Sequence, residues 1–294
     1  MPSKTHLVIW GFRRKYDTFR YIHTGFAAAG NRLGWQVDWV DDDAKNASIV
    51  TPQSLVISMN LCQTFLPLVP GARYVIHNNE RSDLAEQISA GFGINLQTWT
   101  FNCPGHKMDG QEAIRYNSAT RTLFEAWGTS IPENQWDDPN VSGRRFMFWV
   151  GSIWNNDLGQ GNRPVISELV SALKKVNIRF WHLWRTPEVL HRALIHASGL
   201  RPAVCGAWQA ENGYIPCRAF KNLSFGALPI TNNQAVQVAL GESIPLSTNM
   251  RELVDGYLSM PKAEVIDRTR SAQENLKHFT YEANLLRFRN LVFS

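Results

Sequence analysis

The chain has 294 residues, of which 44% are hydrophobic and 19% charged, so it holds enough apolar material for a buried core and is not a disordered chain. Its net charge of +5 favours an anionic ligand, although the basic residues are scattered along the sequence. No apolar run approaches the roughly 18 residues that span a bilayer. Because the first residues also lack the apolar stretch of a signal peptide, we expect a cytoplasmic protein with no membrane span.

The four cysteines are far apart and form no CxxC pair. This spacing argues against a disulfide framework and against a structural zinc site, and we interpret the cysteines as reduced thiols. The chain also has 11 tryptophans, which can pack in a core or offer flat platforms for sugars and bases.

The first forty residues predict a strand, a helix and a second strand. An apolar run covers residues 7–10, apolar residues recur at helical intervals over 19–33, and residues 36–40 are rich in β-formers. Further strand-like runs at 54–59 and 73–76 are each followed by polar residues. Strands that alternate with helices in this way indicate a parallel α/β sheet.

A second α/β unit begins after a segment of changed composition. Residues 132–143 are polar and rich in turn formers, which predicts a linker. After it, a buried strand at 146–150 leads through a polar loop to an amphipathic helix at 164–176. Strands at 179–184 and 201–205 follow, separated by a helix at 186–198. We therefore expect domains over 1–135 and 144–294, with the last helix able to pack back on the N-terminal domain.

The polar loop after residue 150 lies between a buried strand and the start of a helix, where backbone N–H groups and the helix dipole favour a phosphate. It lacks the Gly-Lys-Ser/Thr of a P-loop and the third glycine of the dinucleotide fingerprint. Gly151, Ser152 and Arg163 are candidate phosphate contacts, and a merely flexible connection is the alternative.

The most specific segment covers residues 213–230. Pro216 can open a helix, Gly226 can end it, and Arg218 then lies in the first turn. A short strand is expected at 228–230 after this helix. A cation there opposes the helix dipole unless an anion neutralises it, so Arg218 is a candidate anion contact.

This segment resembles the C-terminal domain of GT-B nucleotide-sugar glycosyltransferases, with a donor-domain motif like that of the group 1 type. The matching positions are Pro216, Arg218, Phe220, Gly226 and Leu228-Pro229-Ile230. The resemblance implies that Arg218 contacts the donor diphosphate. Where the family has an acidic residue for the donor ribose, this chain has Lys221 followed by Asn222, so the ribose contact falls to Asn222, Glu211 or another group.

A glycosyltransferase that inverts the anomeric configuration of the transferred sugar needs a general base near the acceptor hydroxyl. The polar cluster after the strand at 73–76 offers His77, Glu80 and Asp83, and there is a distant likeness to phage DNA glucosyltransferases, which carry an aspartate base after a comparable strand. The alternative is a helix cap on a solvated face. Asp41, Asp42 and Asp43 are interpreted as turn residues, and the resemblance implies no catalytic metal.

The sequence therefore predicts two Rossmann-like domains facing each other across a cleft, in a glycosyltransferase that moves a sugar from a nucleotide-sugar donor to an acceptor hydroxyl. The acceptor is expected to be a glycan or a small molecule. One alternative is a DNA glycosyltransferase acting on hydroxymethylated bases, for which Arg13, Arg14 and Lys15 would contact DNA. The other is a sugar- or nucleotide-binding module without catalytic activity.

Overall fold

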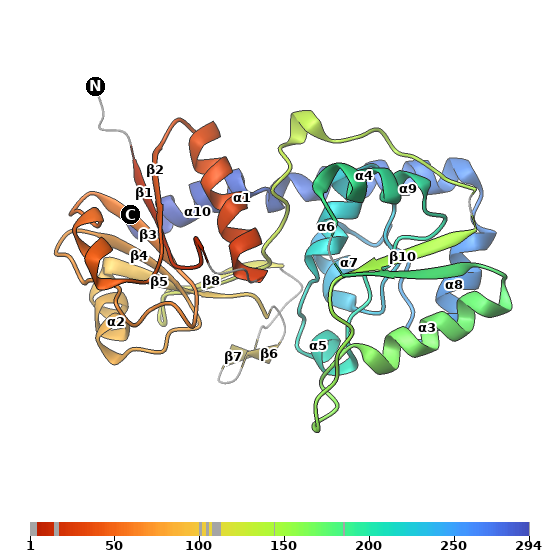
Figure 1. Cartoon of the computed structure of the whole chain (residues 1–294), viewed down its shortest axis with the longest axis horizontal. Coiled ribbons are helices and arrows are strands. Elements are labelled where there is room, and N and C mark those ends of the chain that lie inside the picture. The colour runs from red at the N-terminus through yellow and green to blue at the C-terminus, as the bar shows by residue number, and fades with distance from the viewer. Residues whose placement is uncertain are drawn as a thin grey trace. The chain divides into compact units, whose positions relative to one another are not determined.

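A computed structural model describes residues 5–14, 18–99, 102–103, 106–107, 113–143, 145–184 and 186–293, with the side chains of 18, 102, 103, 106 and 107 excepted. The chain divides into two compact units (Figure 1). Unit 1 contains residues 1–98, 114–132 and 280–294, and unit 2 contains residues 99–113 and 133–279.

Unit 1 is built on a seven-stranded sheet of order β2-β1-β3-β4-β5-β9-β8. All neighbours are parallel except β8 and β9, which form an antiparallel pair. The strands are β1 (His6–Trp10), β2 (Gln36–Val40), β3 (Ser54–Ser58), β4 (Arg73–His77), β5 (Gly93–Gln97), β8 (Ile114–Asn117) and β9 (Thr122–Glu125). The order 2-1-3-4-5 is that of a doubly wound sheet, whose ligand sites lie beyond the carboxyl ends of its strands.

Helices cover both faces of this sheet, which explains why its central strands are apolar on both sides. Helix α1 (Thr18–Arg32) packs beside α10 (Tyr281–Phe293), the last helix of the chain (Figure 1). The rings of Phe26 and Tyr281 stack at 4.6 Å in that contact. On the other face, α2 (Ser82–Gln87) and the π-helical turn η2 (Ile88–Phe92) contribute Leu84 and Ile88 to the core.

Unit 2 has a shorter regular sheet, in which β10 (Phe146–Val150) pairs in parallel with β11 (Arg179–Leu183). The next extended segments join it through single parallel bridges, Met147 to Leu200, Pro202 to Ile230 and Thr231 to Leu246. The sequence predicted full strands at 201–205 and 228–230. Pro202, Pro229 and Pro245 lie in these segments, and because proline has no N–H to donate, the ladder is interrupted.

Seven α-helices are described in unit 2. They are α3 (Arg163–Lys175), α4 (Glu188–Ala197), α5 (Ala207–Glu211), α6 (Cys217–Ser224), α7 (Gln234–Leu240), α8 (Met250–Ser259) and α9 (Lys262–Leu276). The expected amphipathic stripe of α3 is buried, at Ile166, Leu169 and Leu173. Helix α9 packs against both α6 and α7 and so supports the segment that carries the glycosyltransferase-like motif.

Short elements complete the chain: η1 (Ala44–Ile49), β6 (Asn102–Cys103), β7 (His106–Lys107), η3 (Glu133–Gln135) and η4 (Lys277–Phe279). The predicted linker is irregular apart from η3. It is bonded to the end of α6, where Asp137 N donates to Ser224 O and Asn140 N donates to Gly226 O. Gly226 has φ +67°, and a Cβ there would lie 2.1 Å from Asp138 O, so both the turn and the close approach require glycine.

No helix in the described part of the chain is long and apolar enough to cross a membrane. Cys62, Cys205 and Cys217 are free thiols, and the side chain of Cys103 lies outside the described residues.

Candidate functional site

Helix α6 carries the motif that sequence analysis singled out. Pro216 is its N-cap residue, so the helix begins at Cys217 and Arg218 lies in its first turn. The helix ends before Gly226, as expected. Residues 219–224 of the helix are buried.

The guanidinium of Arg218 lies over the indole of Trp149, with Cζ 3.3 Å from the ring centroid. Its Nη1 atom is buried and has no hydrogen-bond partner among the described residues, and neither has Trp149 Nε1. No carboxylate of the described residues pairs with Arg218. Burial lowers the pKa of Arg218 to about 10, so the group is charged at neutral pH but poorly solvated. An anion beside Nη1 would remove this penalty.

A small cavity of about 30 Å³ adjoins the guanidinium. It is lined by Phe148, Trp149, Val150, His191, Pro202, Arg218 and Asn222. This volume holds a water molecule or two and not a nucleotide. Arg218 and Asn222 are thus brought together by α6 at the carboxyl end of β10, and a larger ligand could place no more than a small group, such as a phosphate oxygen, in this cavity.

Lys221 follows one turn later on α6 and is buried. Its Nζ donates to Glu188 Oε2 at 2.6 Å, across to the first residue of α4. His191 is one turn further along α4, where burial, together with the charges of Lys221 and Arg218, lowers its pKa to about 3. The imidazole is therefore neutral at physiological pH.

The loop from Gly151 to Asn162 is held by its own side chains. Asn162 Nδ2 donates to Ser152 O, and Asn162 Oδ1 accepts from Trp154 N. Gly151 adopts φ +107°, a conformation that favours glycine, directly after the last residue of β10. These bonds argue against a merely flexible connection.

Arg163 is the first residue of α3 and is exposed. Its backbone N–H is already bonded to Trp154 O, which leaves one donor fewer for a phosphate at this helix start. Arg163 does not line the cavity beside Arg218. Gly151 and Ser152 follow the cavity residue Val150 along the chain.

In unit 1 the three candidate bases are all close to the carboxyl end of β4, but their surroundings differ. Glu80 is exposed, and its Oε2 accepts from Leu61 N at 3.4 Å. Asp83 is engaged by Arg81 through both carboxylate oxygens, and hydrogen bonds from Arg81 lower the pKa of Asp83. His77 is buried, and burial lowers its pKa to about 4.

The imidazole of His77 is enclosed by aromatic rings. It lies 4.8 Å from the ring of Trp127 and 5.8 Å from that of Phe19, and its Nε2 is 3.3 Å from Thr98 Oγ1. Of the three candidates, Glu80 alone is exposed and is free of an ion pair with a described residue.

The three consecutive aspartates after β2 each bond to a different partner. Asp41 accepts from Arg14 N, Asp42 accepts from the indole of Trp10, and Asp43 caps η1. The described residues contain no group of three His, Cys, Asp or Glu side chains that could hold a metal ion.

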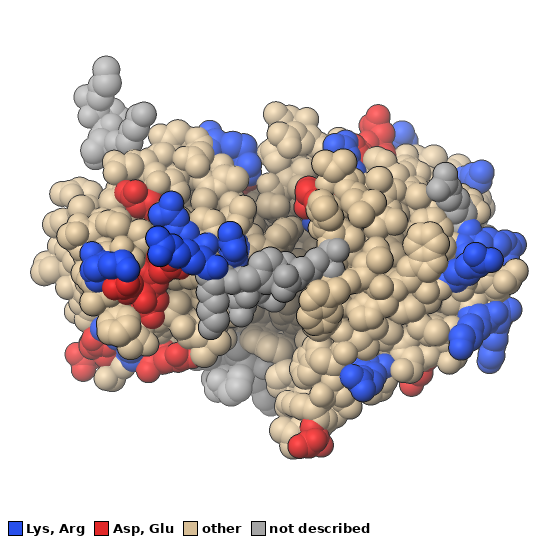
Figure 2. Space-filling view, in the orientation of Figure 1, with Lys and Arg blue, Asp and Glu red and all other residues tan. Residues whose placement is uncertain are grey.

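The basic cluster expected to meet DNA is placed beside these carboxylates. Arg14 also forms an ion pair with Asp41, Arg13 is exposed, and Lys15 lies outside the described residues. On the face shown in Figure 2, described lysine and arginine residues are interspersed with acidic and uncharged ones and form no continuous band. This distribution does not support a DNA partner.

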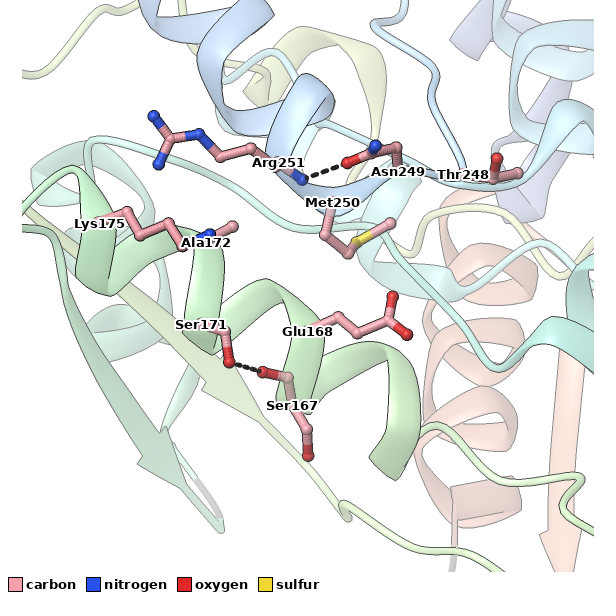
Figure 3. A pocket seen from close by; sticks show the side chains of 9 residues that line it. All are labelled: Ser167, Glu168, Ser171, Ala172, Lys175, Thr248, Asn249, Met250 and Arg251. Carbon is pink, nitrogen blue, oxygen red and sulfur yellow. Dashed lines mark hydrogen bonds between the residues drawn. The ribbon is translucent and has the colours of Figure 1, made fainter.

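A wider groove of about 620 Å³ lies between α3 and the start of α8 (Figure 3). Glu168 and Met250 point into it, and Ser171 Oγ donates to Ser167 O of its own helix. At the other wall, Asn249 Oδ1 caps α8 by accepting from Arg251 N. None of the residues that sequence analysis selected lines this groove.

Sequence reasoning missed Trp149, Glu188 and His191, which surround Arg218 and Lys221. These residues come from β10 and α4, and nothing in their local pattern distinguishes them from core or helix-face residues. It also missed Gln63, which lies in the loop after β3 and bonds to the segment that carries Glu80. Its polar side chain directly after a buried strand was the available signal.

No protein-family model matches the chain, and no curated protein matches it in sequence. Among solved structures, a UDP-forming alpha,alpha-trehalose-phosphate synthase from Burkholderia xenovorans is similar over 95% of this chain and 80% of its own, at 9% identity and a TM-score of 0.50. An alpha,alpha-trehalose 6-phosphate synthase from Burkholderia multivorans matches over 95% and 77% at 9% identity and a TM-score of 0.48. The first likeness concerns the fold alone, which is mixed α/β with a parallel sheet, as the sequence predicted.

Proposed function

We propose that the chain is a glycosyltransferase that transfers a sugar from a nucleotide-sugar donor to an acceptor hydroxyl on a glycan or small molecule. The observation that carries the proposal is Arg218, a poorly solvated cation in the first turn of α6 with a buried, unpartnered Nη1 among the described residues. Its position opposes the helix dipole, and a donor diphosphate would relieve both costs.

Lys221 and Asn222 extend the proposed donor site along the same helix. A diphosphate that replaced part of the Glu188 contact would gain a second cation from Lys221. The two cations then stabilise the charge that develops on the nucleotide diphosphate as the bond to the sugar breaks. We propose on this basis that transfer proceeds without a catalytic metal. The similarity to a UDP-forming synthase makes UDP-sugars the first donors to test.

For an inverting reaction, we propose Glu80 as the general base. The acceptor oxygen attacks the anomeric carbon, the carbon–oxygen bond to the diphosphate breaks with its electron pair leaving on the nucleotide, and the acceptor proton passes to Glu80. Glu80 is preferred because Asp83 is held by Arg81 and His77 is enclosed by rings. A retaining reaction would not use this base.

The test is a panel of UDP-glucose, UDP-N-acetylglucosamine and GDP-mannose, scored both for thermal stabilisation and for nucleotide release with sugar and phenolic acceptors. A donor at 100 times its dissociation constant adds about 2.7 kcal/mol to stability, which raises the melting temperature by several degrees. Stabilisation together with release supports the proposal. Stabilisation without release would favour a binding module, and neither response would refute both.

A further inference from the structure

The side chain of Gln63 is 2% exposed and lies between the loops that follow β3 and β4. Its Nε2 donates to His77 O at 3.2 Å and to Asn78 O at 3.3 Å. Its Oε1 accepts from Glu80 N at 3.1 Å. All three of these bonds are to backbone atoms of the segment that carries Glu80, so the side-chain amide of Gln63 fixes the position of that segment.

The contacts are reciprocal. Leu61 N donates to the Glu80 carboxylate, and Arg81 Nη1 donates to Gln63 O and to Leu66 O, both at 2.7 Å. Glu80 is therefore held at its backbone by Gln63 and at its carboxylate by the loop in which Gln63 lies.

The backbone at this edge of the sheet is strained. Phe12, Leu61 and Asn78 have φ angles of 57°, 66° and 49°, and they follow the adjacent strands β1, β3 and β4. Left-handed conformations cost free energy in residues with a side chain, and they persist where surrounding bonds enforce them, which happens most often at functional sites. Gln63 bonds the carbonyl of Asn78, where an asparagine tolerates this conformation better than most residues.

We propose that Gln63 is a positioning residue that holds Glu80 in place as the general base; this rests on the proposed function. The role needs an amide, because only an amide of this length donates to two carbonyls while accepting from Glu80 N. Methionine has the size without the donors. Glutamate keeps the acceptor, loses the donors and adds a charge beside Glu80.

The experiment compares Gln63→Met, Glu80→Gln and the double variant, after their melting temperatures have been measured. Gln63→Met should lower kcat 10- to 100-fold while KM for the nucleotide sugar and the dissociation constant for UDP stay unchanged. In the Glu80→Gln background, Gln63→Met should cause no further loss, because a residue that acts through Glu80 has nothing left to position. If Gln63→Met does not fold, Gln63→Asn serves, because its amide is one methylene too short to make all three bonds and it should likewise lower kcat.

Gln237→Met is the matched control. Gln237 lies on α7, and its Nε2 likewise donates to a backbone carbonyl, Ile244 O at 2.7 Å, but within unit 2. It should lower the melting temperature and leave kcat unchanged.

Four outcomes would overturn the positioning role. If kcat is unchanged in Gln63→Met but falls greatly in Glu80→Gln, the positioning role of Gln63 is refuted and Glu80 remains the base. Losses of kcat that multiply in the double variant refute the positioning role in the same way. Wild-type turnover in Glu80→Gln refutes both the positioning role of Gln63 and the assignment of Glu80 as the base. If UDP still binds, the proposed binding of a nucleotide-sugar donor stands. Absence of both nucleotide binding and release in the wild type refutes the proposed function itself.

Discussion

Lys221 Nζ lies 2.6 Å from Glu188 Oε2, so the lysine that stands where the glycosyltransferase motif it resembles has an acidic residue is itself paired with a carboxylate from α4. The pair joins the motif helix to the helix that carries His191. Because Lys221 is buried, the charge of Glu188 decides how much positive potential the lysine presents to a ligand beside Arg218.

Replacing Glu188 with glutamine should therefore strengthen UDP binding severalfold, since the variant removes one negative charge from the surroundings of the diphosphate. Calorimetric titration at about 50 and 200 mM salt measures the effect, which should shrink at the higher salt because the Glu188 side chain is half exposed. Equal affinities for the wild type and Glu188→Gln at low salt would mean that Lys221 does not face the donor.

The three candidate bases should respond differently to substitution. Glu80→Gln should lower the rate of an inverting transfer 10²- to 10⁴-fold with donor binding retained. Asp83→Asn should have a smaller effect on rate, because Asp83 is tied to Arg81 and acts on the reaction only through loop structure. Initial rates with saturating donor make the comparison, and a larger loss in Asp83→Asn than in Glu80→Gln would assign the base to Asp83.

Stability should fall on acidification through buried histidines, of which His23 is the clearest case. Burial lowers its pKa from 6.5 to about 4, so between these values the unfolded chain binds a proton that the folded chain excludes. Unfolding free energy should drop by about 1.4 kcal/mol per pH unit across this window from His23 alone.

His23→Asn keeps a donor for Gly11 O, which the imidazole Nδ1 now bonds at 2.9 Å, and removes the titration. Its unfolding free energy should depend less steeply on pH between about 6.5 and 4 than that of the wild type. Glu125, whose pKa burial raises to about 7, is common to both chains and cancels in the comparison. Denaturant unfolding at several pH values gives the slopes, and parallel slopes would contradict this account of His23.

Metal removal tests the proposal that cationic side chains stabilise the charge on the diphosphate without a metal ion. Nucleotide release after treatment with EDTA should match that of the untreated protein, because Arg218 and Lys221 supply the positive charge. A loss that added Mg²⁺ or Mn²⁺ restores would show that a divalent cation shares this task.

Much of the fold could be predicted from apolar patterning. Strands at 36–40 and 146–150 and the helix of α3 are present where continuous or periodic apolar residues indicated them. The strands expected at 201–205 and 228–230 failed to form full ladders, since apolar content says nothing of the N–H groups that Pro202 and Pro229 lack.

The geometry of the candidate site was predictable only where one local segment carries it. The proline, arginine and glycine of α6 set its start, its first-turn cation and its end within one stretch of chain. The partners that decide what Arg218 can do, Trp149 below its guanidinium and Glu188 beside Lys221, are remote in sequence. Local sequence spacing does not predict such contacts, because they form only when β10, α4 and α6 pack together.

The most direct test of the account is a calorimetric titration of UDP into the wild type and Arg218→Ala, with Arg192→Ala as the control. Arg192 is an arginine of α4 that is already paired with Asp137. The account predicts that Arg218→Ala weakens UDP binding by about 1.5–3 kcal/mol, the scale of a hydrogen bond to a charged group, while Arg192→Ala does not. An unchanged dissociation constant in a folded Arg218→Ala, or no binding of UDP by the wild type, would contradict it.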